Sequence, residues 1–268
     1  MRKIVICATQ RSGSTMLCKE LEATTVLGRP QEIYINPQVT NLHEAQSFIK
    51  KIMQKCQSSN EVFAVKIMQS QWTKVNSVHS FEKYKSFFLE SLFKKYCRRK
   101  PIDEILFNQV NHFYEFYKDA TWIFLRRRDC LYQAISREMA HQTRVCHILN
   151  TNDVEKNAGI GQRTSININE SSNYNQKAIY KAENIQRRIQ EIKNEEIAWL
   201  YFFENYRLKP IELFYEDIVD DKLYLQTIAT KVGVSLPRQL NTIPLVKVRN
   251  VLNDEWAERF RNEASLRS

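Results

Sequence analysis

A polar segment near the N-terminus carries the residue types that bind a phosphate group. Residues 9–15, TQRSGST, follow the apolar run of residues 4–8 and lead into a segment with helical spacing. At a strand-to-helix junction, free backbone N–H groups and the helix dipole attract an anion, and Arg11 adds a fixed positive charge. We therefore expect an anion-binding loop. The alternative is an ordinary connection in which Ser14 or Thr15 only caps the helix.

The composition of the loop narrows the kind of anion site. The chain has only 5 glycines, so Gly13 does not come from a glycine-rich background. The loop lacks the Gly-x-x-x-x-Gly-Lys-Ser/Thr pattern that binds nucleoside triphosphates, and it has no lysine for a γ-phosphate. These features disfavour a nucleoside triphosphatase, although a P-loop-type kinase acting on a small molecule stays an alternative.

A second cluster of positive charge follows another apolar run. Residues 121–125 are followed by Arg126, Arg127 and Arg128. In an open α/β sheet, ligands bind beyond the carboxyl ends of the strands, so we expect these arginines at the same edge as Arg11. The pleat of a strand places Arg127 on the opposite side from the other two, so the three cannot all contact one phosphate. Alternatively, the run is a solvated face or a nucleic-acid contact.

The elements that would position these residues alternate between strand and helix. Apolar runs predict strands at residues 4–8, 61–68, 121–125 and 210–215. Helical spacing is found at residues 15–23, 42–56, 80–95, 102–117, 130–147, 180–206 and 224–232. This alternation predicts an α/β fold with a central, mainly parallel sheet flanked by helices. Residues 151–176, rich in Asn, Ser, Thr and Gly, predict a long polar loop that is either a lid or disordered.

Length and composition predict one globular domain over residues 1–268. Hydrophobic content is 43% and charged content 26%, near the averages for globular proteins. The longest apolar run, residues 197–203, is too short to span a bilayer, and residues 4–8 are too short for a secretory signal. We therefore expect a cytoplasmic protein without stable membrane insertion.

Cysteine spacing and net charge bear on metals and partners. The 6 cysteines include no Cys-x-x-Cys pair and no His–Cys cluster at zinc-ligand spacing, so we expect free thiols and no metal. The net charge of +10 attracts anions, and nucleic acid, an acidic membrane surface or a polyphosphorylated ligand would each fit. A nucleic-acid-binding protein is the main alternative, supported by the basic runs at residues 98–100 and 126–128.

Together, the loop and the arginine run resemble the sulfotransferases that use 3′-phosphoadenosine 5′-phosphosulfate (PAPS), most closely the bacterial trehalose-type sulfotransferase family. The similarity continues in order along nearly the whole chain, through GRPQE at 28–32, FAVKIM at 63–68, QT at 142–143, YED at 215–217 and EWAERF at 255–260. The chain departs from the family at Gln10, where a proline is usual. Residues 151–176 match no known segment, so the acceptor cannot be transferred from the family.

The resemblance implies a P-loop-like sulfotransferase fold and roles for individual residues. The 5′-phosphosulfate would be held by Arg11, Ser12, Gly13, Ser14 and Thr15. Arg128 and Ser136 would bind the 3′-phosphate, and Glu32 would be the catalytic base. The reaction would transfer a sulfuryl group to a hydroxyl of a carbohydrate, a glycolipid or another small molecule, leaving 3′,5′-adenosine bisphosphate (PAP). Related enzymes are often homodimers.

The chemistry of sulfuryl transfer suits these residues. Because the donor is already activated, the protein mainly aligns the groups and stabilises charge on the leaving phosphate, which Arg11 and the loop N–H groups can do without a metal. Lys66 interrupts an apolar strand, so it either faces the sulfuryl oxygens or the acceptor, or points to water from a strand edge. Glu32 is either the base or an exposed turn residue. The rival bases are His43, His79, His112, His141 and His147.

Overall fold

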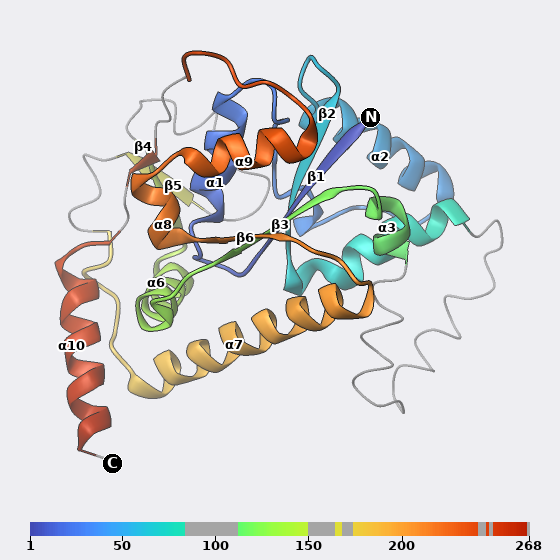
Figure 1. Cartoon of the computed structure of the whole chain (residues 1–268). Coiled ribbons are helices and arrows are strands. Elements are labelled where there is room, and N and C mark those ends of the chain that lie inside the picture. Colours follow the sequence, from blue (N-terminus) through green and yellow to red (C-terminus); the bar gives the residue numbers. More distant parts are fainter. Residues whose placement is uncertain (84–111, 150–163, 168–173, 241–244, 247–248, 267–268) are drawn as a thin grey trace.

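The computed structural model describes residues 1–83, 112–149, 164–167, 174–240, 245–246 and 249–266. Its main sheet has four parallel strands in the order β2-β1-β3-β6. The strands are β1 (Arg2–Ala8), β2 (Val62–Met68), β3 (Thr121–Arg126) and β6 (Ile211–Phe214). All four were predicted from apolar runs, and the predicted α/β fold with a central parallel sheet is confirmed (Figure 1).

The central strands are apolar on both faces because helices cover both sides of the sheet. Val5 and Cys7 of β1 belong to one core cluster, whereas Ile4, Ile6 and Ala8 of the same strand belong to another. All five side chains are fully buried. A strand buried in this way appears in sequence as a continuous apolar run, without the alternation of a half-exposed strand.

Two groups of helices build these cores (Figure 1). The first face is covered by α2 (Leu42–Cys56), α3 (Trp72–Lys83) and α7 (Ala182–Asn205). The second is covered by α1 (Ser14–Ala23), α8 (Tyr215–Asp220) and α9 (Leu223–Val232). A third cluster joins α7 to α6 (Cys130–Thr143) and α10 (Val251–Ser265). Two short 3₁₀ helices complete this part of the chain: η1 (Ile33–Ile35) precedes α2, and η2 (Gln69–Gln71) follows β2 directly.

Several boundaries differ from the predictions. The helix predicted over residues 130–147 ends at Thr143, because Arg144 adopts a left-handed conformation (φ 65°) and turns the chain into β4 (Val145–Leu149). A small second sheet pairs β4 with β5 (Thr164–Asn167) and β7 (Leu245–Val246), so the predicted loop at 151–176 contains a strand.

Other predicted elements fall partly outside the described residues. The helix expected at residues 80–95 begins earlier, at Trp72, and residues 84–95 lie outside the described part of the chain. The helix expected at 102–117 is described only for residues 112–117, which are helical. Most of the predicted loop at 151–176 also lies outside the described residues.

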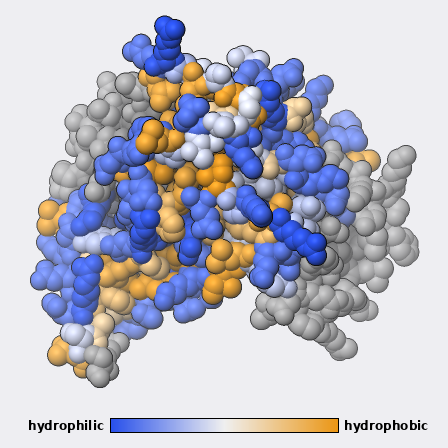
Figure 2. All heavy atoms as spheres, viewed as in Figure 1, coloured by the Kyte–Doolittle hydropathy of each residue, from blue (hydrophilic) through white to orange (hydrophobic). Residues whose placement is uncertain are grey.

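The surface of the protein is largely polar in the view of Figure 2, where hydrophilic residues cover most of the face and smaller hydrophobic areas lie between them. In the described part of the chain no helix is long and apolar enough to cross a membrane. The same residues contain no cluster of metal-ligating side chains. The five described cysteines are free thiols.

Candidate active site

The anion-binding loop, residues 9–15, lies at the carboxyl end of β1 and leads into α1. Arg11 and Gly13 both adopt left-handed conformations, with φ of 65° and 89°. Ser12, which is fully buried, donates from Oγ to the carbonyl oxygen of Thr9 at 2.9 Å and closes the turn. Gly13 is the N-cap of α1 and has no side chain to accept from the first-turn N–H groups. Those N–H groups therefore remain available to an anion.

Gly13 is required by its conformation and by its contact with Tyr215, the first residue of α8. A Cβ atom at Gly13 would lie 2.3 Å from Cδ2 of Tyr215. This distance is far below van der Waals contact, so any side chain at position 13 must displace either the loop or the tyrosine ring. The loop is therefore fixed against α8 as well as against β1.

We predict that Gly13→Ala destabilises the protein more than the matched control Gly233→Ala. Both glycines have left-handed φ, so both alanines carry about 1–2 kcal/mol of backbone strain. Only Gly13→Ala adds a steric overlap, because a Cβ atom at Gly233 would meet no described atom within 4 Å. Urea denaturation of the two variants measures the difference. Equal losses of unfolding free energy would show that Tyr215 moves aside without cost.

The side chain of Arg11 connects the loop to two other elements. Its Nε donates to Oγ of Ser136 on α6 at 2.9 Å, and its Nη1 donates to the carbonyl oxygen of Cys146 on β4. The structure thus brings Arg11 and Ser136, predicted from separate motifs, into direct contact. The guanidinium lies at the junction of the loop, α6 and the small sheet.

Lys66, Glu32 and Thr15 also meet. Lys66 lies within β2, only 6% exposed, and its Nζ is 2.9 Å from Oε2 of Glu32. The same Nζ is 3.4 Å from Oγ1 of Thr15, in the first turn of α1. Oε1 of Glu32 accepts from Nε2 of Gln71 at 2.8 Å. Lys66 is therefore not the strand-edge lysine of the alternative interpretation, and Glu32 is not a free turn residue.

The segment before Glu32 is held against β2. Gly28 has φ of 79°, and a Cβ there would lie 2.6 Å from Cβ of Ala64, so the chain crosses β2 at a distance that only glycine allows. Gln31 pairs with Val65 in a parallel bridge, and the N–H of Lys66 donates to its carbonyl oxygen at 3.1 Å. This pairing places Glu32 beside Lys66.

The three arginines at the end of β3, Arg126 to Arg128, contact different partners. Arg126 pairs with Glu196 at 2.9 Å. Arg128, whose side chain is 52% exposed, makes two hydrogen bonds to Asp217 at 2.5 and 2.7 Å, and these bonds lower the pKa of Asp217. The structure therefore does not bring Arg128 to Ser136. Its assignment to the 3′-phosphate stays a prediction.

Arg127 is the arginine of this run that contacts the loop. Its side chain is 14% exposed, and its Nη1 donates to the carbonyl oxygen of Arg11 at 3.4 Å. The guanidinium lies 4.9 Å from the ring centre of Tyr215, and burial lowers the pKa of Arg127 below its usual value. Nε of Arg127 has no hydrogen-bond partner among the described residues. The sequence predicted that Arg127 points away from Arg126 and Arg128, but not that it contacts the loop.

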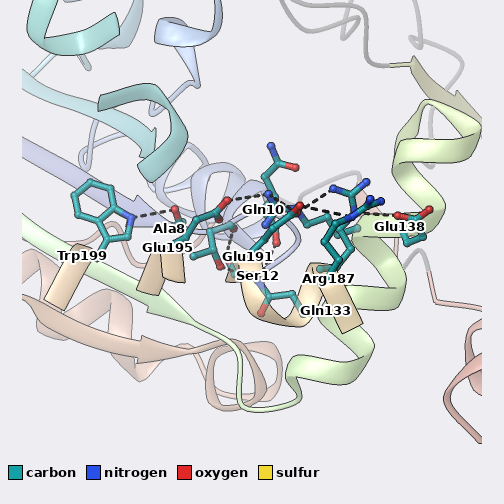
Figure 3. A network of polar contacts seen from close by, with 12 residues as sticks. Ala8, Gln10, Ser12, Gln133, Glu138, Arg187, Glu191, Glu195 and Trp199 are labelled. Atoms are coloured by element: carbon teal, nitrogen blue, oxygen red, sulfur yellow. Dashed lines mark hydrogen bonds and ion pairs between the residues drawn. The ribbon is translucent and has the colours of Figure 1, made fainter. Parts of the chain in front are cut away.

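Ion pairs between α6 and α7 hold the helix that carries Ser136. Arg137 pairs with Glu195 at 2.8 Å, and Arg188 pairs with the buried Glu138 at 2.9 Å. Burial raises the pKa of Glu138, but hydrogen bonds from Gln142, Arg188 and Asn184 outweigh it, so the net shift is downward. Figure 3 shows the network that runs from Trp199 of α7 past the loop to Glu138.

Two glutamines of the candidate site were not predicted from the sequence. Gln71 contacts Glu32, and Gln133 contacts the loop backbone. Each is a single polar residue in a segment of mixed character, and no spacing rule distinguishes it from a surface glutamine. The usable signal was their position shortly after a predicted strand, where ligand-facing side chains are common.

The parallel sheet, the loop at its edge and the Lys66–Glu32 pair together form the candidate active site. The family model described as Stf0 sulphotransferase matches residues 3–263. The chain therefore belongs to this family of trehalose-type sulfotransferases, and it is a transferase. Among curated proteins none matches the chain.

Proposed function

We propose that the enzyme transfers a sulfuryl group from PAPS to a hydroxyl of a carbohydrate or glycolipid. One observation carries this proposal. Lys66 lies between the anion-binding loop, through Thr15, and the carboxylate of Glu32. A donor held at the loop and an acceptor held at Glu32 would thus meet next to a buried ammonium group.

The donor side of the proposal uses the loop. Arg11, Ser12, Gly13, Ser14 and Thr15 would hold the 5′-phosphosulfate through backbone N–H groups, hydroxyls and one guanidinium. Negative charge develops on the leaving phosphate during transfer, and preorganised donors stabilise it without reorganisation. Arginine, lysine and the N-terminus of α1 supply this positive field, so the proposal includes no metal.

The acceptor side uses Glu32 as general base and Lys66 as an electrostatic catalyst. A sugar hydroxyl is a weak nucleophile, and a carboxylate within hydrogen-bond reach can remove its proton as the new S–O bond forms. Gln71 holds one carboxylate oxygen of Glu32, and its own Oε1 accepts from the N–H of Met68 at 3.1 Å. The base is therefore oriented by the backbone at the end of β2. Lys66 would contact the sulfuryl oxygens.

Arg127 and Arg128 are both candidates to bind the 3′-phosphate, and substitution of each residue distinguishes between them. The resemblance assigns Arg128 with Ser136, but Arg128 makes two hydrogen bonds to Asp217, whereas Arg127 lies against the loop and forms a looser ion pair with Glu216 at 3.9 Å. We expect Arg127→Ala to weaken PAP binding roughly tenfold or more, and more than Arg128→Ala does. Adenosine 5′-monophosphate, which lacks the 3′-phosphate, should lose less affinity, and the part that it does lose reports the bond from Arg127 to the Arg11 carbonyl.

Isothermal titration of both ligands with both variants makes this measurement. A larger, 3′-phosphate-specific loss for Arg128→Ala would support the assignment implied by the resemblance. It would also require the Arg128–Asp217 pair to open when the ligand binds. Ser136→Ala should show the same loss as whichever arginine shares its phosphate.

The function is tested directly by mass spectrometry. The purified protein is incubated with PAPS and a metabolite extract or a panel of sugars and glycolipids, and products are searched for a gain of one sulfuryl group. Release of PAP should match the amount of product. Omission of PAPS and the Arg11→Ala variant serve as controls. Absence of PAP binding, or magnesium-dependent consumption of ATP in place of PAPS, would contradict the proposal and favour a P-loop-type kinase.

A further inference from the structure

The backbone carbonyls at the end of β1 and in the first part of the anion-binding loop all accept hydrogen bonds from side chains. Four successive carbonyl oxygens, those of residues 8–11, are engaged in this way. Their donors are Trp199 Nε1 to Ala8 at 3.2 Å, Ser12 Oγ to Thr9 at 2.9 Å, Gln133 Nε2 to Gln10 at 2.8 Å and Arg127 Nη1 to Arg11 at 3.4 Å. A carbonyl oxygen is partly negative, so an anion site needs its carbonyls turned away and its N–H groups turned inward.

Gln133 makes the most specific of these contacts. It lies in the first turns of α6 and is fully buried. Besides the bond to the Gln10 carbonyl, Nε2 donates to Oγ1 of Thr9 at 2.7 Å, so both amide hydrogens are used on the loop. The Gln10 carbonyl can only accept, which fixes Nε2 as the atom that faces it.

The oxygen of the Gln133 amide has a different environment from its nitrogen. Oε1 of Gln133 is buried and has no hydrogen-bond partner among the described residues. A buried acceptor without a partner costs free energy that a leucine or methionine at this position would avoid. Among the described residues, the hydrogen bonds of the Gln133 amide group are therefore the two that it donates to the loop.

The helix that carries Gln133 is itself fixed. Ser136, one turn further along α6, accepts a hydrogen bond from Nε of Arg11. Gln133 and Ser136 therefore lie on one face of α6, where Gln133 contacts the loop backbone and Ser136 contacts the side chain of Arg11. Arg137 then anchors α6 to Glu195 of α7. A rigid helix thus sets the position of the loop.

We propose that Gln133 is a positioning residue of the anion-binding loop. By holding the Gln10 carbonyl and the Thr9 hydroxyl, it keeps the loop N–H groups directed at the 5′-phosphate end of the ligand. The inference rests on the proposed function, because it takes that ligand to be PAPS or its product PAP.

The test compares two ligands that differ only at the 5′ end. Gln133→Met keeps the length of the side chain and removes the amide. Its affinity for PAP should fall roughly tenfold, while its affinity for adenosine 3′-monophosphate, which lacks the 5′-phosphate, should stay at the wild-type value. In steady state the KM for PAPS should rise and the KM for the acceptor should not.

The matched control is Gln142→Met on the same helix. The amide of Gln142 bonds to Glu138 and Ile179, and this variant should leave both affinities unchanged.

The ratio of the two affinities separates positioning from folding. An unfolded fraction lowers the number of binding sites for both ligands in one preparation and leaves their ratio unchanged. Gln133→Glu provides a second variant of nearly equal volume, in which a carboxylate faces the Gln10 carbonyl, and its ratio should shift at least as far as that of Gln133→Met. An unchanged ratio in both variants would overturn the inference and make Gln133 a structural residue only. Failure of the wild-type protein to bind PAP would contradict the proposed function instead.

Discussion

Replacement of Glu32 by glutamine is expected to lower turnover by about 10²–10⁴-fold while donor affinity hardly changes. The amide keeps the size of the carboxyl group but cannot accept the proton of the attacking hydroxyl. Gln71 can still donate to the oxygen of the new amide, but the amide nitrogen then faces Nζ of Lys66, so the contact with Lys66 is lost together with the base. PAPS-dependent product formation measured by mass spectrometry, together with PAP titration, separates the two effects.

The surroundings of Glu32 supply the controls for this prediction. Glu22 on α1 forms a comparable pair with Lys19 at 2.9 Å on the exposed side of the helix, so Glu22→Gln should leave turnover unchanged. The acidic limb of the pH profile reports ionisation of the base and should be absent in Glu32→Gln. Near-normal turnover of Glu32→Gln, combined with loss in a histidine variant such as His112→Ala, would assign the base to that histidine.

Replacement of Arg11 by alanine is expected to weaken PAP binding by about 10- to 150-fold, corresponding to a loss of roughly 1.5–3 kcal/mol for a charge-assisted contact. The KM for PAPS should rise while the KM for the acceptor stays nearly constant. Arg11→Lys refines the test, because it retains the charge but loses the planar group that bonds to both Ser136 and Cys146.

A matched arginine outside the loop controls for the loss of one positive charge. Arg29 is exposed and bonds to the backbone carbonyls of Gln54 and Gln57, so Arg29→Ala removes an equal charge without touching the loop. Its PAP affinity should match that of the wild type. Wild-type donor affinity and turnover in Arg11→Ala would show that the loop is not the donor site.

The sheet was predictable because β1, β2 and β3 contain long apolar runs that are buried on both faces, and because three of the four residues of β6 are apolar. The strand-to-helix junction at residues 9–15 was predictable because a glycine and polar residues stand between an apolar run and a segment with helical spacing. The end of α6 was not predictable, since apolar spacing continues through Val145 and Cys146, and only the left-handed Arg144 ends the helix.

The partners of polar side chains were harder to foresee. The pleat of β3 indicated that Arg127 differs from its neighbours, but not that Asp217 pairs with Arg128 or that Arg127 reaches the loop. Such contacts join residues far apart in sequence, and their choice depends on how helices pack against the sheet. Periodicity describes each element separately, so it does not contain this information.

The position of β1 in the sheet has a consequence for biosynthesis. β1 leaves the ribosome before both of its neighbours, because Val5 pairs with Val65 on one side and with Trp122 on the other. At roughly 5–20 residues per second, the apolar run of β1, residues 4–8, waits for seconds before either neighbour exists. Such long-range parallel pairing is slow and leaves apolar edges open to aggregation. Newly made chains should therefore depend on chaperones more than the stability of the finished sheet would suggest.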